Sequence, residues 1–474
     1  MCTSVSVGKE ATKEGVILIS RNEDCLRANW NKYLVHRAEP EYVKYKNTVQ
    51  HGLWVLGNGL KVPVPENAFS YSGTPDADSL SESSSAVGSY FYFEERGINE
   101  KNFAISATNS LIMNTAAEQA DPLVQDEGVI EANIPTLLLS QATSAQHALE
   151  LLGHYVETYG AGEANGVLLA DPNESWYFEI GSGHHWIAVR IPADRYIAVA
   201  NGMRVHDVDL SDTENVRHSN GLVEFVEDHK LLKTVDPAHF DFAAAFGDLT
   251  IAANYNRIWL AQHKLTPSLK QDTDQHQYPM FLKPDKKVGV DDVMGVLTAT
   301  YEGTPLQGKA TRTIGWDKTG ESHIITLDPN MPAALAGIIW QSISTPLCAP
   351  YMPLYRAMTE VPQGFAIGSD QYSATSAYWA FRGLFSLAKS QGKDVLDETA
   401  AMWHDYVAGL LAEHAPIKKM IKTMYEADPQ SAVDFVSRYS TGITFQAIAK
   451  ANTARNALMT KIAQDDQTVI AIDV

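Results

Sequence analysis

The chain has 474 residues, of which 45% are hydrophobic, 9% aromatic and 20% charged. This composition is typical of a globular protein with ample material for a buried core, and it excludes wholesale disorder. The formal net charge of -20 argues against nucleic acid as a partner, because such binding depends on Lys and Arg side chains at phosphates. We therefore expect a small neutral or zwitterionic substrate.

The beginning of the chain and its cysteines indicate the compartment. There is no apolar run long enough to cross a bilayer, and the first residues lack the apolar core of a signal peptide. The three cysteines, Cys2, Cys25 and Cys348, are too few for a disulfide framework and indicate a reducing compartment. We expect a cytoplasmic protein with no membrane contact, in which Cys25 and Cys348 are small core residues.

Two short β-type runs open the chain, CTSVSVG and VILIS, and the polar connector KEATKEG joins them. Together they predict an antiparallel hairpin. If the connector is centred near Ala11 and Thr12, residues whose numbers sum to about 23 face each other. This centre places Cys2 opposite Arg21.

A loop and a helix follow in the first half of the chain. Residues 73–88 are rich in Ser and acids, so they predict a surface loop or a mobile flap. Residues 143–160 predict a core helix that Thr143 or Ser144 caps and Gly160 ends. Its apolar face consists of Ala148, Leu151, Leu152, Tyr155, Val156 and Tyr159.

The second half begins with strands and ends with helices. The runs GVLLA, SWYFEI, HWIAVRI and YIAVAN predict strands whose short connections require antiparallel neighbours. A helical zone follows through YNRIWLAQHKL, and roughly the last hundred residues read as amphipathic helix. Strands and helices alternate in blocks without a βαβ rhythm, which favours a layered α+β fold.

Cys2 is the candidate nucleophile. The initiator Met is generally removed before a small residue, which would leave a thiol and a free α-amine on one residue. A free α-amine titrates with a pKa of about 7.7 to 8 and a free thiol near about 8.5, so the amine can accept the thiol proton at neutral pH. Judged by position alone, a Cys at position 2 is usually only a small terminal residue without a function.

Arg21 and Asp24, in the segment RNED, are candidates to assist Cys2. A fixed cation beside the sulfur favours the thiolate and disfavours a protonated amine. A carboxylate three positions later can accept hydrogen bonds from the amine and hold it in place. Nucleophile, base and orienting group would then lie within one hairpin.

Other catalytic classes lack their motifs. The sequence contains no HExxH, GxSxG, GxxxxGK[ST] or CxxC pattern. The adjacent His184 and His185 would point to opposite faces of a strand, so they are poorly placed to share a metal ion. We expect neither a metal nor another cofactor.

Several segments together carry a family resemblance. They are MCTSVSVGKEATKEG, ISRNED, GINEKNFAISATN, FEIGSGHHWIAVRIP, YIAVAN, YEGTP and GIIWQSISTPLCAPYMPLY. The chain resembles the bacterial dipeptidases related to penicillin V acylase and bile-salt hydrolase, which are N-terminal-nucleophile cysteine hydrolases. The resemblance implies a four-layer αββα fold with Cys2 at the edge of a central strand. Because Cys2 follows Met1 directly, we expect activation to need only removal of the methionine.

The resemblance also implies roles for three further residues. Asn109 in SATN corresponds to a position whose backbone N–H contributes to the oxyanion hole, and Asn201 in VAN would supply a side-chain amide to the same oxygen. Arg257 in YNRIW corresponds to a second arginine, which organises the charged cluster around the amine. Without the resemblance, Asn201 reads as a turn residue and Arg257 as a residue on a helix surface.

These observations predict a metal-independent cysteine dipeptidase that cleaves dipeptides through a thioester on Cys2. Residues 1–365 would form the hydrolase domain, and residues 366–474 a mostly helical extension packed on it. The extension would cover the cleft or build a homo-oligomer. Two alternatives stay open: an amidase acting on penicillin V or conjugated bile acids, and an inactive relative that binds peptides.

Overall fold

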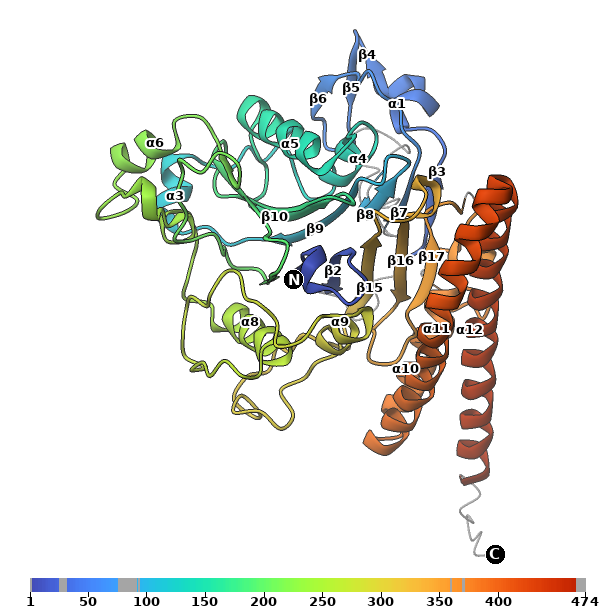
Figure 1. Ribbon diagram of the computed structural model, residues 1–474. Coiled ribbons are helices and arrows are strands. Elements are labelled where there is room, and N and C mark those ends of the chain that lie inside the picture. The colour runs from blue at the N-terminus through green and yellow to red at the C-terminus, as the bar shows by residue number, and fades with distance from the viewer. Residues whose placement is uncertain are drawn as a thin grey trace, which may run out of the picture.

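The computed structural model describes residues 2–24, 32–75, 92, 94–358, 360–368 and 371–465; side chains at 107–109 are not described. Within these ranges two antiparallel sheets lie face to face, and helices cover the outer face of each (Figure 1). The predicted α+β class and the four layers αββα are therefore confirmed.

The first sheet contains both strands of the N-terminal hairpin as internal strands. Its order is β13 (Tyr196–Val199), β1 (Thr3–Val7), β2 (Ile17–Asp24), β15 (Thr319–Leu327), β16 (Gly337–Ile343) and β17 (Met352–Tyr355). β1 and β2 are antiparallel neighbours, as the sequence predicts. Strands that are distant in sequence thus surround the start of the chain.

The second sheet is a longer meander. Its order is β14 (Val216–His218), β12 (Trp186–Arg190), β11 (Ser175–Ile180), β10 (Asn165–Ala170), β9 (Ala104–Ser110), β8 (Glu94–Asn99), β7 (Tyr71–Pro75) and β3 (Val35–Arg37). A small separate sheet is formed by β4 (Val49–Gln50), β5 (Leu53–Val55) and β6 (Lys61–Pro63).

Helices cover both sheets. On or near the second sheet lie α1 (Glu41–Lys44), α3 (Thr115–Ala120), α4 (Ile134–Leu139), α5 (Ala145–Tyr159) and α6 (Leu222–Asp228) (Figure 1). α7 (Phe242–Phe246) contacts α3. The first sheet is covered by α8 (Ala252–Leu265), α9 (Val290–Leu297), α10 (Ala377–Ser390), α11 (Lys393–Ala427) and α12 (Pro429–Asp465).

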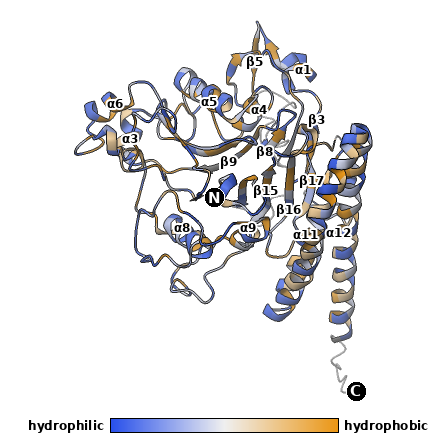
Figure 2. Ribbon diagram, in the orientation of Figure 1, coloured by the Kyte–Doolittle hydropathy of each residue, from blue (hydrophilic) through white to orange (hydrophobic). Residues whose placement is uncertain are grey.

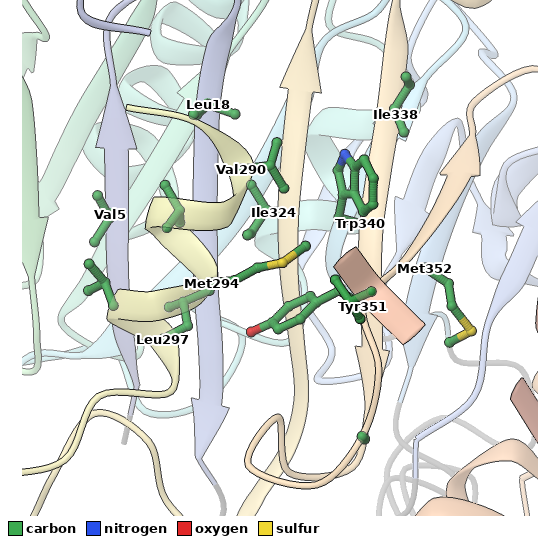
Figure 3. Close-up of a cluster of buried hydrophobic side chains, with 14 of the residues drawn as sticks. Val5, Leu18, Val290, Met294, Leu297, Ile324, Ile338, Trp340, Tyr351 and Met352 are labelled. Atoms are coloured by element: carbon green, nitrogen blue, oxygen red, sulfur yellow. The ribbon is translucent and has the colours of Figure 1, made fainter. Parts of the chain in front are cut away.

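Three apolar clusters separate the layers. One joins the second sheet to the helices above it, through Val167 and Phe178 against Leu152 of α5. A middle cluster fills the space between the sheets, and it contains Ile19 and Ile325. The third lies between the first sheet and its helices. Figure 3 shows it, with labelled members Val5, Leu18, Val290, Met294, Leu297, Ile324, Ile338, Trp340, Tyr351 and Met352.

The register of the hairpin differs from the predicted one. Ser4 faces Arg21, so continuing the pairing places Cys2 opposite Glu23. The predicted pairing of Cys2 with Arg21 is wrong by two residues, because the connector is centred one residue later than expected. A shift of two keeps every side chain on its face, so Cys2 and Arg21 stay on one face as diagonal neighbours.

One predicted strand pairing is also wrong. β10, β11 and β12 are antiparallel neighbours as expected, but β13 pairs with β1 in the other sheet and not with β12. The short connection at 191–195 therefore crosses between the sheets. Gly8 makes this possible by its close approach: its N–H bonds to the Arg195 carbonyl at 2.9 Å, and an added Cβ would lie 2.3 Å from the Pro192 carbonyl oxygen.

The predicted helices are present. α5 begins after Ser144, whose side chain accepts a hydrogen bond from the His147 N–H, and it ends at Gly160 with a φ of 77°. α8 matches the second helical zone. The loop predicted at 73–88 is partly in β7, and its residues from 76 onward lie outside the described ones.

The C-terminal helices pack on the first sheet. Residues of α10, α11 and α12 belong to the same apolar cluster as Trp340 and Met352 of the sheet. Hydrophobic and hydrophilic residues alternate along α11 and α12 (Figure 2), and Figure 1 shows α12 extending beyond the body of the molecule. The domain boundary at 365/366 stays a prediction.

Candidate active site

Cys2 lies immediately before the central strand β1, and it is 3% exposed. Its carbonyl oxygen accepts a hydrogen bond of 2.5 Å from Nη1 of Arg257. The same nitrogen donates to Oγ1 of Thr3 at 3.0 Å. The first residues of the strand are therefore fixed by a side chain from helix α8, although more than 250 residues separate them in sequence.

Arg257 is fully buried, which excludes its interpretation as a residue on a helix surface. Nε donates to the Ala253 carbonyl, one turn earlier in α8, at 3.0 Å. Nη2 donates to Oδ1 of Asn254 at 2.8 Å and to Oδ1 of Asn201 at 2.9 Å. Burial, with a smaller effect from the charge of Arg312, lowers the pKa of Arg257 to about 10. The guanidinium therefore keeps its charge at neutral pH.

Asn201 lies just after β13, beside the start of β1, and is 2% exposed. A guanidinium only donates hydrogen bonds, so the contact with Arg257 fixes Oδ1 on that side of the amide. Nδ2 then donates to the Ser110 carbonyl at 3.3 Å. Since Nδ2 carries two hydrogens, one remains after this bond for a further acceptor.

Arg21 approaches from between the two sheets. It is 1% exposed, and its Nη2 lies 2.7 Å from Oε2 of Glu95 and 3.3 Å from Oε1 of Glu131. Burial alone lowers the pKa of Arg21, but the charges of Cys2, Glu95 and other acids outweigh it and raise that pKa well above the ordinary value. Arg21 is therefore a permanent cation near Cys2.

A second cation balances the acids behind Arg21. Lys32 forms an ion pair with Glu23 and lies 3.8 Å from Oε1 of Glu95. Burial raises the pKa of Glu95, but the charges of Lys32 and Arg21 more than offset this and lower it. Lys32, Glu23 and Glu95 were not predicted as site residues from the sequence. The sequence offered only the adjacent acids Glu94 and Glu95 as a signal, and the structure places them in a strand whose residues are all buried.

Asp24 points to the face opposite Arg21, because the two positions differ by an odd number along β2. It forms an ion pair with Arg312 and accepts a hydrogen bond of 2.5 Å from Thr319 Oγ1. Burial raises the pKa of Asp24 despite the opposing charge of Arg312. Its predicted role in holding the amine stays a prediction, and Arg312 is a partner that the sequence did not indicate.

Asn109 lies in β9, where only its backbone is described. It pairs with Gly166, whereas the next pair along is Ala107 with Val167, so the ladder is irregular at Thr108. Such bulges reorient the backbone and often lie next to active sites. The oxyanion role of the Asn109 N–H stays a prediction.

The other candidates occupy structural positions. Cys348 is buried, and burial raises the pKa of its thiol to about 12, which keeps it protonated at neutral pH. Cys25 lies outside the described residues. His184 Nδ1 contacts Asp121 Oδ1 at 2.9 Å, and His185 Nδ1 contacts Ser219 Oγ at 3.0 Å. The two histidines therefore have different partners.

The chain is similar to known peptidases over most of its length. The model of peptidase family C69 matches residues 1–405. A probable dipeptidase from Latilactobacillus sakei is 34% identical over 407 residues, which are 82% of this chain and 81% of that protein. A probable dipeptidase from Salmonella dublin is 34% identical over 382 residues, which are 77% of this chain and 82% of that protein.

Among solved structures, a mutant conjugated bile acid hydrolase from Clostridium perfringens aligns with a TM-score of 0.34 and 12% identity. The alignment covers 72% of this chain and 89% of that chain. In the described ranges, none of the helices is both long and apolar enough to cross a bilayer. The family match spans both large sheets and the site around Cys2. The chain therefore belongs to peptidase family C69 and is a peptide hydrolase.

Proposed function

We propose that this protein is a dipeptidase whose nucleophile is the thiol of Cys2, exposed as the chain terminus by removal of Met1. The observation that carries the proposal is the convergence of Arg257 and Asn201 on the start of β1. Arg257 holds the Cys2 carbonyl and orients the Asn201 amide at the same time. Arg21 supplies a fixed positive charge from the other side.

In the proposed reaction the Cys2 sulfur attacks the scissile carbonyl carbon while the thiol proton passes to the α-amine. The carbonyl oxygen becomes an oxyanion, which accepts hydrogen bonds from Asn201 Nδ2 and the Asn109 backbone N–H. The α-amine then protonates the leaving amino group as the C–N bond breaks, which leaves a thioester. Water adds to this thioester, the amine accepts its proton, and the first amino acid and the free thiol are released.

Intact mass and turnover of dialanine by the full-length protein test the proposal. We expect the mass of a chain without Met1, and loss of hydrolysis to background in Cys2→Ala. Cys348→Ala is the matched control, because that thiol is buried and protonated, and it should keep most of the activity. An active enzyme that retains Met1, or a Cys2→Ala variant that still hydrolyses dialanine, would refute the mechanism.

The two alternatives are separated by a substrate panel. Faster turnover of penicillin V or a conjugated bile acid than of any dipeptide would favour the amidase. No turnover of either class by a chain that retains Met1 would favour the inactive relative. Activity that a chelator removes and only zinc or manganese restores would contradict metal-independent catalysis. The cytoplasmic location and the homo-oligomer stay predictions from the sequence.

A further inference from the structure

Glu131 is the most exposed member of the charged group around Arg21. It lies directly before α4, and its side chain is 18% exposed, whereas those of Arg21 and Glu95 are 1% and 6% exposed. Its Oε1 is 3.3 Å from Nη2 of Arg21, and the charge of Cys2 helps to raise the pKa of Arg21. Glu131 therefore lies at the border between the buried cluster and the side open to solvent.

A second carboxylate is held beside Glu131. The backbone N–H of Glu131 donates to Oε2 of Glu163 at 2.9 Å. A bridge between Val129 and Ala161 keeps the two segments side by side, and the Gly162 N–H donates to the Val129 carbonyl at 2.8 Å. The approach of the two acids is thus fixed by the backbone.

Asn165 adds an acceptor that has no hydrogen-bond partner among the described residues. It is fully buried at the start of β10, and its Oδ1 accepts no hydrogen bond from the described residues. Its Nδ2 lies 3.5 Å from Oε2 of Glu163, so the amide borders the acidic pair. Asn165 faces Ser110 in the ladder between β9 and β10, and the Ser110 carbonyl accepts the hydrogen bond from Asn201. This acceptor group therefore adjoins the amide proposed for the oxyanion.

An ammonium group matches this arrangement. It carries three N–H donors and no acceptor, and its strongest partners are carboxylates. In a dipeptide the α-ammonium and the scissile carbonyl belong to the same residue, with the nitrogen roughly 2.5 Å from the carbonyl carbon. An ammonium subsite must therefore adjoin both the nucleophile and the oxyanion donors, which is where Glu131, Glu163 and Asn165 lie.

We propose that Glu131, Glu163 and Asn165 bind the α-ammonium group of the substrate's first residue and so restrict the enzyme to peptides with a free amino terminus. This inference rests on the proposed function.

The pKa of Glu131 gives independent support. Burial, and next the charge of Glu95, raise it to about 7. A substrate ammonium beside this carboxyl favours its ionised form, so binding would lower this pKa and add a second cation to the contact with Arg21.

The test compares dialanine with propionyl-alanine, which has nearly the same shape but no amine. The wild type should strongly prefer dialanine. In Glu131→Gln we expect KM for dialanine to rise by about tenfold or more, with turnover of propionyl-alanine unchanged, because a charged hydrogen bond is lost only with the first substrate. Glu163→Gln should show the same pattern. If Glu131→Gln does not fold, Glu163→Gln alone tests the subsite.

Glu127→Gln is the matched control. Glu127 lies four positions earlier in the same loop, its side chain is 59% exposed, and it pairs with the surface residue Lys61. This variant should retain the preference of the wild type. If Glu131→Gln and Glu163→Gln also retain it, or lose turnover of both substrates equally, the subsite is refuted. A wild type that cleaves no dipeptide would instead refute the proposed function.

Discussion

Arg257 joins two residues that lie far apart in sequence: its Nη2 donates to Oδ1 of Asn201 at 2.9 Å while its Nη1 donates to the Cys2 carbonyl at 2.5 Å. One rigid fork thus fixes the position of the proposed nucleophile and the orientation of the proposed oxyanion donor. A lysine at this position would supply the charge but not the two divergent donors.

Arg257→Lys should therefore lower kcat for dialanine by about 100-fold, since it releases both Cys2 and the Asn201 amide. Steady-state kinetics measure the effect. Arg195→Lys is the control, because Arg195 has a side chain that is 49% exposed. Equal activities of these two variants would mean that the buried fork does not organise the site.

Asn201→Asp should lower kcat by about 100 to 1000-fold, because a carboxylate still accepts from Arg257 but offers no N–H to an oxyanion. Asn254→Asp is the comparison. Asn254 accepts from the same nitrogen of Arg257 at 2.8 Å, but it has no proposed contact with substrate. The Asn254→Asp variant should therefore lose clearly less kcat than Asn201→Asp. Equal losses would mean that Asn201 acts only through its contact with Arg257.

Asp24→Asn should reduce the free energy of unfolding by about 3 kcal/mol, because it removes the charge of the carboxylate that pairs with the buried Arg312. Urea unfolding of the single variants and of Asp24→Asn with Arg312→Gln completes a double-mutant cycle. The double variant should recover part of the loss. Strictly additive losses would show that the two side chains are not coupled.

Glu41 predicts a pH-dependent stability. It is 1% exposed, and burial raises its pKa from 4.5 to about 8 despite a hydrogen bond from Trp54. Between these values the folded chain keeps a proton that the unfolded chain has lost, so this carboxyl makes stability fall as pH rises. The contribution approaches about 1.4 kcal/mol per pH unit within this window.

Glu41→Gln removes that contribution. Urea unfolding at several pH values from 5 to 8 should show the variant gaining stability relative to the wild type as pH rises. If the free energies of unfolding of the wild type and the variant change with pH in the same way over this range, the raised pKa of Glu41 is contradicted.

Trp403 tests the packing of the helical extension. It is 3% exposed in α11, and its ring meets that of Phe381 in α10 edge to face, with centroids 5.6 Å apart. Trp403→Ala should cost about 3 to 5 kcal/mol of stability in chemical denaturation. Met420→Ala, at a position that is 41% exposed in the same helix, should cost far less. Equal effects would argue against a packed interface.

Local patterns predicted the elements well. Alternation over CTSVSVG and VILIS predicted the hairpin, and the apolar face, cap and final glycine predicted α5. Each of these signals acts between residues a few positions apart, where the sequence is sufficient. The same logic failed for β13, because a short connection does not reveal whether the next strand continues the sheet or crosses to another.

The site divides in the same way. The sequence determined that Cys2, Arg21 and Asp24 lie at the same end of one hairpin, since their spacing along two antiparallel strands requires it. Only the tertiary structure decided that Arg257 is buried against Cys2, that Arg312 pairs with Asp24, and that Glu131 reaches Arg21. These contacts join residues from 110 to 288 positions apart. They form because a charge between packed layers requires a partner, and the packing of the sheets selects which partner lies within reach.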